Sequence, residues 1–193
     1  MKTLLLDSTY KDLNVGLCID GKMHETCYEC FQRQSELMIP EIDKILKANK
    51  VNPKEIDSIV VTHGPGSYTG LRIALTIAKV YSYAVNCPCY SLSSLNVLCK
   101  PNVESICLIN ARSNRSYFGV YKDNKCIVED CIMPNDKVLE YIKDHKEYAV
   151  CGEVDYLNIE GYKADLLNNM NELKNEENKV KDIFTLKATY LKD

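Results

Sequence analysis

The sequence predicts a mixed α/β protein built from two related lobes, and three observations support this. Short apolar segments with strand character alternate with longer segments of helical periodicity. The order strand, strand, strand, helix, strand, helix fills residues 1–100, and a similar order follows over residues 101–193. A chain of 193 residues with 46% hydrophobic composition is large enough for two small lobes. We therefore predict an N-terminal lobe over 1–100 and a smaller C-terminal lobe over 101–193.

The first half begins with a short apolar strand over residues 3–6 and a half-buried strand over residues 13–19, where apolar and polar side chains alternate. Asp20-Gly21 is a hairpin signal, so residues 22–30 should return antiparallel. Pro40 should kink the next helix or mark its start. The remaining predicted elements are a helix over 35–50, a strand over 56–62, a helix over 69–85 and a strand over 89–92.

The second half repeats this order without repeating the residues. A hairpin joined at Asp123-Asn124 follows its first strand. The predicted elements are strands over 105–110, 116–122, 125–133 and 148–151, helices over 136–145 and 163–173, and a β-leaning segment over 183–191.

Composition excludes several classes of protein. The net charge of −3 provides no basic field for unaided binding of nucleic acid. No apolar stretch approaches the ~20 residues that span a bilayer, and the N-terminus does not resemble a signal peptide. We therefore expect a cytoplasmic protein with no membrane association. The ten cysteines are interpreted as buried free thiols rather than disulfides or a zinc site.

A glycine-rich turn from His63 to Gly70 links the strand over 56–62 to the helix over 69–85. Its glycines allow close backbone approach, its serine can cap the helix, and a helix start favours anions. A candidate nucleotide or phosphate loop therefore combines this turn with the end of the first strand: Asp7, Ser8, Thr9, Gly64, Gly66, Ser67 and Gly70. A turn that binds nothing fits the spacing equally well.

Known catalytic fingerprints do not match this turn. It lacks the lysine of a P-loop, and it is one residue longer than either the P-loop or the dinucleotide-binding pattern. The three histidines lie far apart in the sequence, and there is no Gly-x-Ser-x-Gly elbow. We therefore predict no catalytic residue and no metal site. The turn then serves mainly to set how the following helix leaves the sheet.

The run Gly64–Ile73, which reads GPGSYTGLRI, resembles the signature of the bacterial TsaB family, also called YeaZ. Residues 5–9, 91–95, 110–112 and 190–192 extend the resemblance. It implies an actin-like, Hsp70-like (ASKHA) fold with two ribonuclease-H-like βββαβα lobes, the second one reduced. This agrees with the repeated element order.

The resemblance also implies a function. TsaB-like proteins are non-catalytic scaffold or activating subunits of the complex that makes N6-threonylcarbamoyladenosine (t6A) at position 37 of tRNAs reading ANN codons. The catalytic paralogue TsaD is the partner, a small ATPase, TsaE, joins the complex, and homodimers can form through the same surface. The chain would need no cofactor of its own, because ATP and tRNA would be bound through the complex.

Both helices of the first half carry more apolar surface than one short lobe needs to cover, which is typical of a partner interface. Their periodicity suggests a helical-bundle contact through Met38, Ile42, Leu71, Leu75 and Ala78. Two alternatives stay open. One is a small ATP-binding kinase or ATPase of the actin-like superfamily that uses Asp7 and the glycine turn. The other, disfavoured by the missing metal ligands, is a glycoprotease-like peptidase.

Overall fold

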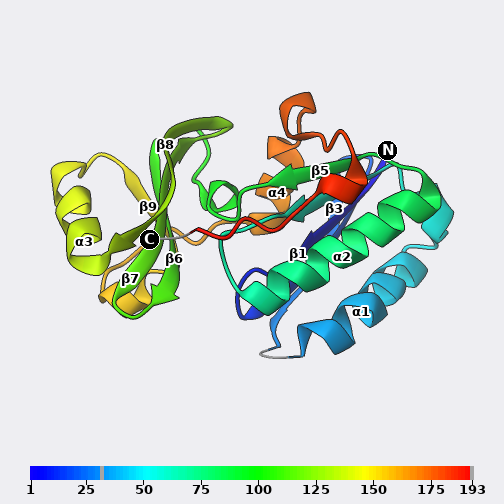
Figure 1. The fold of residues 1–193 in the computed structure, drawn as a ribbon. Helices are drawn as coiled ribbons and strands as arrows, with labels where there is room; N and C mark the ends of the chain where they lie inside the picture. The colour runs from blue at the N-terminus through cyan, green and yellow to red at the C-terminus, as the bar shows by residue number, and fades with distance from the viewer. Residues whose placement is uncertain (31–32, 192–193) are drawn as a thin grey trace.

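The computed structural model describes residues 1–30 and 33–191 and contains two β-sheets (Figure 1). Lys192, the last residue of the resemblance at 190–192, lies outside these ranges. The first half contains β1 (Lys2–Asp7), β2 (Asp12–Ile19), β3 (Lys22–Glu29), α1 (Gln34–Ala48), β4 (Ser58–Thr62), α2 (Tyr68–Val85) and β5 (Cys89–Leu92). The second contains β6 (Ser105–Arg112), β7 (Arg115–Lys122), β8 (Lys125–Pro134), α3 (Asn135–Asp144), β9 (Ala149–Gly152) and α4 (Leu166–Leu173). Short 3₁₀ turns are η1 (Pro53–Glu55), η2 (Asn96–Leu98), η3 (Asp155–Leu157), η4 (Glu176–Asn178) and η5 (Ile183–Thr185).

The two sheets share a topology. The first has the strand order β3-β2-β1-β4-β5, and the second has the order β8-β7-β6-β9. In each, three consecutive strands pair antiparallel, and the strand after the next helix pairs parallel to the first of them. The predicted α/β class and the repeated order of elements are therefore confirmed.

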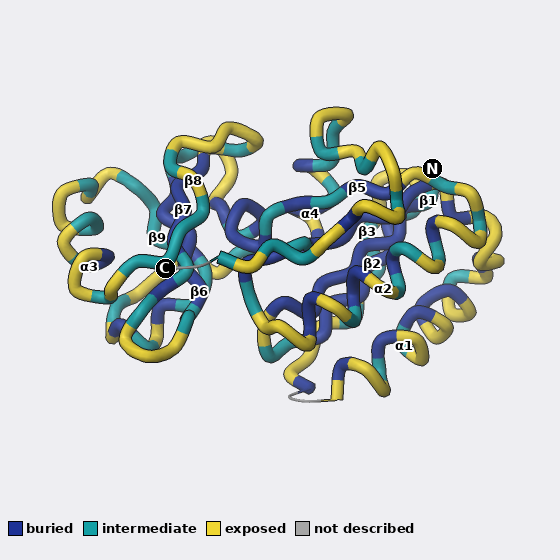
Figure 2. The backbone as a smooth tube through the Cα atoms, in the orientation of Figure 1, coloured by how far each residue is buried: buried dark blue, intermediate teal, exposed yellow. Residues whose placement is uncertain are grey.

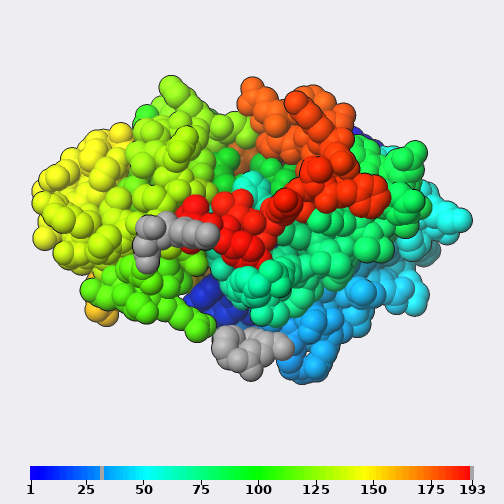
Figure 3. Space-filling view, viewed as in Figure 1, coloured from blue at the N-terminus to red at the C-terminus, as the bar shows by residue number. Residues whose placement is uncertain are grey.

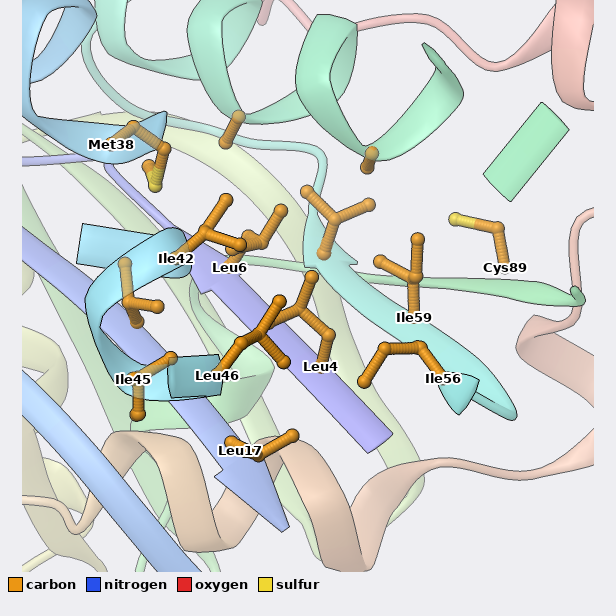
Figure 4. Close-up of a cluster of buried hydrophobic side chains, with 14 of the residues drawn as sticks. Leu4, Leu6, Leu17, Met38, Ile42, Ile45, Leu46, Ile56, Ile59 and Cys89 are labelled. Carbon is orange, nitrogen blue, oxygen red and sulfur yellow. The ribbon is translucent and has the colours of Figure 1, made fainter. Parts of the chain in front are cut away.

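The first sheet is covered on both faces, which explains why β1 and β4 are almost continuously apolar. Successive side chains of a strand point to opposite faces. Leu4 and Leu6 pack in the cluster under α1 and α2, together with Ile59 of β4 (Figure 4). Leu5, between them, belongs to a different cluster.

That second cluster, which we call the junction core, joins the two sheets. Helix α4 contacts β1, β2 and β4, and its Leu167 and Met170 pack in this cluster. Cys107 and Tyr121 bring the second sheet into it.

A third cluster lies between the second sheet and α3 and contains Ile106, Leu108, Phe118, Val120 and Val138. The lobe boundary at residue 100 stays a prediction, because α4 and the residues after it return to the first sheet.

The C-terminal segment differs from its β-leaning prediction. Ile183–Thr185 forms the 3₁₀ turn η5, and no strand includes the residues described after it. Isolated backbone hydrogen bonds hold residues 180–191 against the first half of the chain. They run from Val180 N to Cys89 O and from Thr189 N to His63 O. A β-strand needs a continuous ladder of such bonds, which this path along the surface does not provide.

Two smaller corrections concern local structure. The helix predicted from residue 163 begins at Leu166, after the Asp165 side chain that caps it. Pro40 lies inside α1, so of its two predicted positions only the start of the helix is excluded. All ten cysteines are free thiols, but Cys27 and Cys126 are exposed and Cys87 and Cys131 are only partly buried. None of the helices in the described ranges is both long and apolar enough to cross a membrane.

Candidate functional site

The glycine turn packs directly on the backbone that follows β1. A Cβ atom on Gly66 would lie 2.4 Å from the carbonyl oxygen of Thr9, and one on Gly70 would lie 1.8 Å from that of Ser8. Real side chains do not approach a backbone oxygen so closely. These two positions therefore require glycine because two stretches of main chain touch there.

Hydrogen bonds hold this contact from both sides. The Ser67 amide donates to Thr9 O at 2.6 Å, and the Ser8 hydroxyl donates to Gly70 O at 2.8 Å. Ser67 also caps α2, since its hydroxyl accepts from the Gly70 amide at 3.3 Å. The predicted loop residues thus come together, but these polar groups contact one another.

Asp7 is buried at the end of β1 with both carboxylate oxygens occupied. Oδ1 accepts from the hydroxyls of Thr9 at 2.7 Å and Thr62 at 2.6 Å, and Oδ2 accepts from the Asn14 amide group at 2.9 Å. The donors come from β2, β4 and the connection after β1. Asp7 therefore ties the ends of three neighbouring strands together, as buried charged groups require several hydrogen bonds.

The other side of the turn meets the C-terminal segment. Gly64 has a φ of +112°, and a Cβ there would lie 2.7 Å from Thr189 O. Its amide donates to the Ser94 hydroxyl at 3.1 Å. His63 Nδ1 lies 2.9 Å from Ser91 Oγ, and burial lowers the pKa of His63, which favours a neutral ring with a structural role.

A cleft of about 970 Å³ lies between the two sheets. Asp7 and Thr9 reach it, whereas within the described ranges the three glycines of the turn do not line it. Its acidic side chains outnumber its basic ones: Asp7, Asp12, Glu29, Glu153, Asp155 and Glu160 against Lys11 and Lys163. Such a cleft does not attract polyphosphate by its own field.

Glu153 is the most perturbed carboxyl of this cleft. Its Oε2 accepts a hydrogen bond from the backbone amide of Asn110 at 3.1 Å, whereas its buried Oε1 has no hydrogen-bond partner among the described residues. Burial raises the pKa of Glu153 to about 7. Within the described ranges no three cysteine, histidine or acidic side chains converge as a metal site.

The five residues predicted to contact a partner need correction. Met38, Ile42, Leu71, Leu75 and Ala78 are all buried within the chain. Met38, Ile42, Leu75 and Ala78 pack in the cluster that covers the first sheet, and Leu71 lies against Gly64 of the turn. Periodicity identifies an apolar face of a helix but does not tell whether the chain itself or a partner covers that face.

The outer face of α2 also carries apolar side chains, and α1 adds Ile39 to it, although the rest of the exposed face of α1 is mostly charged. Ile39 is 61% exposed, Val80 63% and Tyr83 68%. Exposed stretches, drawn yellow, recur along both helices in Figure 2. A groove of about 480 Å³ runs between the helices and is lined by Ser35, Ile39, Tyr68, Thr69, Arg72, Ile73, Thr76 and Ile77. The sequence signal for this face was the near absence of charge on α2, which carries only Arg72 and Lys79.

The fold and site define a two-sheet α/β protein with an apolar helical face and a glycine turn that serves packing. The family model described as "TsaD: tRNA N6-adenosine threonylcarbamoyltransferase" matches residues 29–181. The chain is similar to the "Uncharacterized protein MG208 homolog" of Mycoplasma pneumoniae, with 30% identity over 98% of this chain and 94% of the relative.

A protein named "tRNA threonylcarbamoyladenosine biosynthesis protein TsaB", from Buchnera aphidicola subsp. Baizongia pistaciae, is 28% identical over 79% of this chain and 75% of that protein. The solved structure of YeaZ from Pseudomonas aeruginosa has the same fold, with a TM-score of 0.82 at 19% identity over 98% of this chain and 99% of that one. The chain belongs to the TsaB (YeaZ) family, and the TsaD family model also matches most of its length.

Proposed function

We propose that this chain is a non-catalytic subunit of the complex that makes t6A at position 37 of ANN-decoding tRNAs, where it binds and stabilises a TsaD-like transferase. The observation that carries the proposal is the exposed apolar groove between α1 and α2, in a protein whose relatives are named for t6A biosynthesis. An apolar patch of this kind is typical of a protein–protein interface.

The contacts within the site favour a non-catalytic role. Asp7 already accepts three side-chain hydrogen bonds, and the glycine turn is filled by backbone from Ser8, Thr9 and Thr189. Nucleotide and tRNA are therefore bound through other subunits, including a TsaE-like ATPase. A homodimer of this chain would use the same groove and compete with the transferase.

We also propose that the two sheets are the ribonuclease-H-like halves of an ASKHA fold in which the second half is reduced. The shared topology supports this. In the first half a second helix and a fifth strand follow β4. In the second half α4 is the only α-helix after β9 among the described residues, no strand of those residues follows β9, and α4 packs on the first sheet.

The test is depletion of this chain in a cell that contains the cognate TsaD-like subunit, with t6A in tRNA measured by mass spectrometry. We expect loss of t6A, and co-purification of the two full-length subunits in a one-to-one complex. Unchanged t6A after depletion, or failure of the purified subunits to bind at micromolar concentration, would contradict the proposal.

The ATP-binding alternative would place nucleotide in the cleft between the sheets, next to Asp7, and this can be tested directly. Titration calorimetry of the isolated chain with Mg-ATP should show no binding up to millimolar nucleotide. Binding that disappears in an Asp7→Ala variant that is still folded would instead favour the kinase or ATPase alternative.

A further inference from the structure

The C-terminal segment, residues 179–191, runs from β5 past α2, and its Tyr190 contacts Tyr68 and Arg72, which line the groove. Val180 N bonds to Cys89 O at 2.9 Å, Leu186 is buried in the core under α2, and Thr189 N bonds to His63 O at 2.7 Å. Figure 3 shows the segment in red across this side of the molecule. It is thus anchored along its length to the first half of the chain.

Two aromatic contacts extend the outer face of α2 onto this segment. Tyr190 stacks on Tyr68, near the start of the helix, with ring centroids 5.1 Å apart. Phe184 meets Tyr83, near its end, edge to face at 5.4 Å. All four rings are exposed, so the segment enlarges the apolar surface of α2 at both ends.

Arg72 contacts both rings of the first pair. Its guanidinium is 3.9 Å from the centroid of the Tyr68 ring, and its Nε donates to the Tyr190 hydroxyl at 2.9 Å. The hydrogen bond to Tyr190 raises the pKa of Arg72, and among the described residues no carboxylate pairs with it. A stacked, hydrogen-bonded guanidinium has lost much of its freedom before any partner arrives.

Among the described residues that line the groove, Arg72 is also the only charged one. Apolar side chains form most of the remaining lining, and α2 carries no acidic residue. The complementary surface is an amphipathic helix with an apolar ridge and one carboxylate near the Arg72 end.

We propose that Tyr190 positions Arg72 to bind a carboxylate on a helix of the TsaD-like subunit, so that the C-terminal segment is part of the partner-binding surface. The inference rests on the proposed function, since it names the chemistry of the same interface. Arg72 contacts the partner, and Tyr190 is a positioning residue that acts through Arg72.

The experiment measures the affinity of the full-length chain for the purified TsaD-like subunit by calorimetry at two salt concentrations. Arg72→Gln should weaken binding about tenfold or more and reduce its salt dependence. Lys79→Gln is the matched control, because it removes the other cation of α2, which lies outside the groove. It should leave the affinity within about twofold.

A double-mutant cycle tests the positioning role. Tyr190→Phe keeps the ring and removes the hydroxyl, and it should weaken binding severalfold in the native background but not in the Arg72→Gln background. If Tyr190→Phe weakens binding by the same factor in both backgrounds, Tyr190 does not act through Arg72 and the positioning role is overturned.

The outcomes separate this inference from the proposed function. Native binding that Arg72→Gln leaves unchanged would overturn the inference alone. Absence of binding by the native chain would overturn the proposed function. If Arg72→Gln disrupts only self-association, the carboxylate belongs to a second copy, and the assignment to the transferase is wrong.

Discussion

Gly70 marks the point where the start of α2 touches the end of β1. Alanine is preferred over glycine inside a helix by about 1 kcal/mol, so Gly70→Ala would stabilise an isolated helix. Here the added Cβ would lie 1.8 Å from Ser8 O, and main chain must move. We expect Gly70→Ala to lower the free energy of unfolding by about 2 kcal/mol or more, measured by urea denaturation.

Gly21→Ala is the control at this scale. Gly21 has a φ of +85° in a hairpin turn, where an added Cβ would meet no atom within 4 Å. Only backbone strain remains, at about 1 kcal/mol. A Gly70→Ala protein as stable as Gly21→Ala or more so would contradict the close contact.

Glu153 should make stability depend on pH. Burial raises its folded pKa to about 7 from an ordinary value of 4.5, so the folded state holds this proton more tightly than the unfolded state. Its contribution is present below pH 4.5 and is lost as the pH rises through about 7. We expect Glu153→Gln to raise the Tm relative to the native chain at pH 8 more than at pH 5. An equal shift at both pH values would show that Glu153 does not titrate in this range.

At the scale of elements, α1 shows how two neighbouring residues serve different purposes. Met38 has no exposed surface and packs on the first sheet, whereas Ile39 is 61% exposed and lines the groove. We expect Met38→Ala to cost about 2–5 kcal/mol of folding stability, because it leaves a cavity.

Ile39→Glu should weaken partner binding while leaving the folding stability almost unchanged. We expect a change of less than about 0.5 kcal/mol in the free energy of unfolding, as at other exposed sites. Binding to the TsaD-like subunit should weaken strongly, because a charge would enter the apolar groove. If Ile39→Glu binds as tightly as the native chain, the groove is not the interface.

At the scale of the whole molecule, three clusters divide the core. The clusters under α1 and under α3 each serve one sheet, whereas the junction core draws on both. We expect Leu46→Ala to reduce hydrogen-exchange protection mainly in β1 and β4, and Val138→Ala mainly in β6 and β7. Met170→Ala in the junction core should reduce protection in both sheets. Equal losses everywhere for all three variants would mean that the chain opens as one unit, without separate lobes.

Much of the fold follows from local sequence. Alternation of side chains along β2, the apolar run of β4 and the helical spacing of α1 predict these elements within a few residues, because period and length depend on neighbours in the chain. The glycines at 64, 66 and 70 indicate, by their spacing alone, a place of close backbone approach. Boundaries are less accurate at α4, where the cap at Asp165 sets the start.

Tertiary structure alone decided what each face and segment contacts. The sequence by itself determined that α1 and α2 are amphipathic or nearly apolar and that the turn between β4 and α2 is tight. Chain segments far away in sequence decide whether Met38 or Ile39 points outward. They also decide that Thr9 and Thr189, rather than a phosphate, fill the turn. The contact between Arg72 and Tyr190 spans 118 residues, so no local pattern encodes it. Periodicity records which side chains avoid water, whereas packing decides which surface covers them.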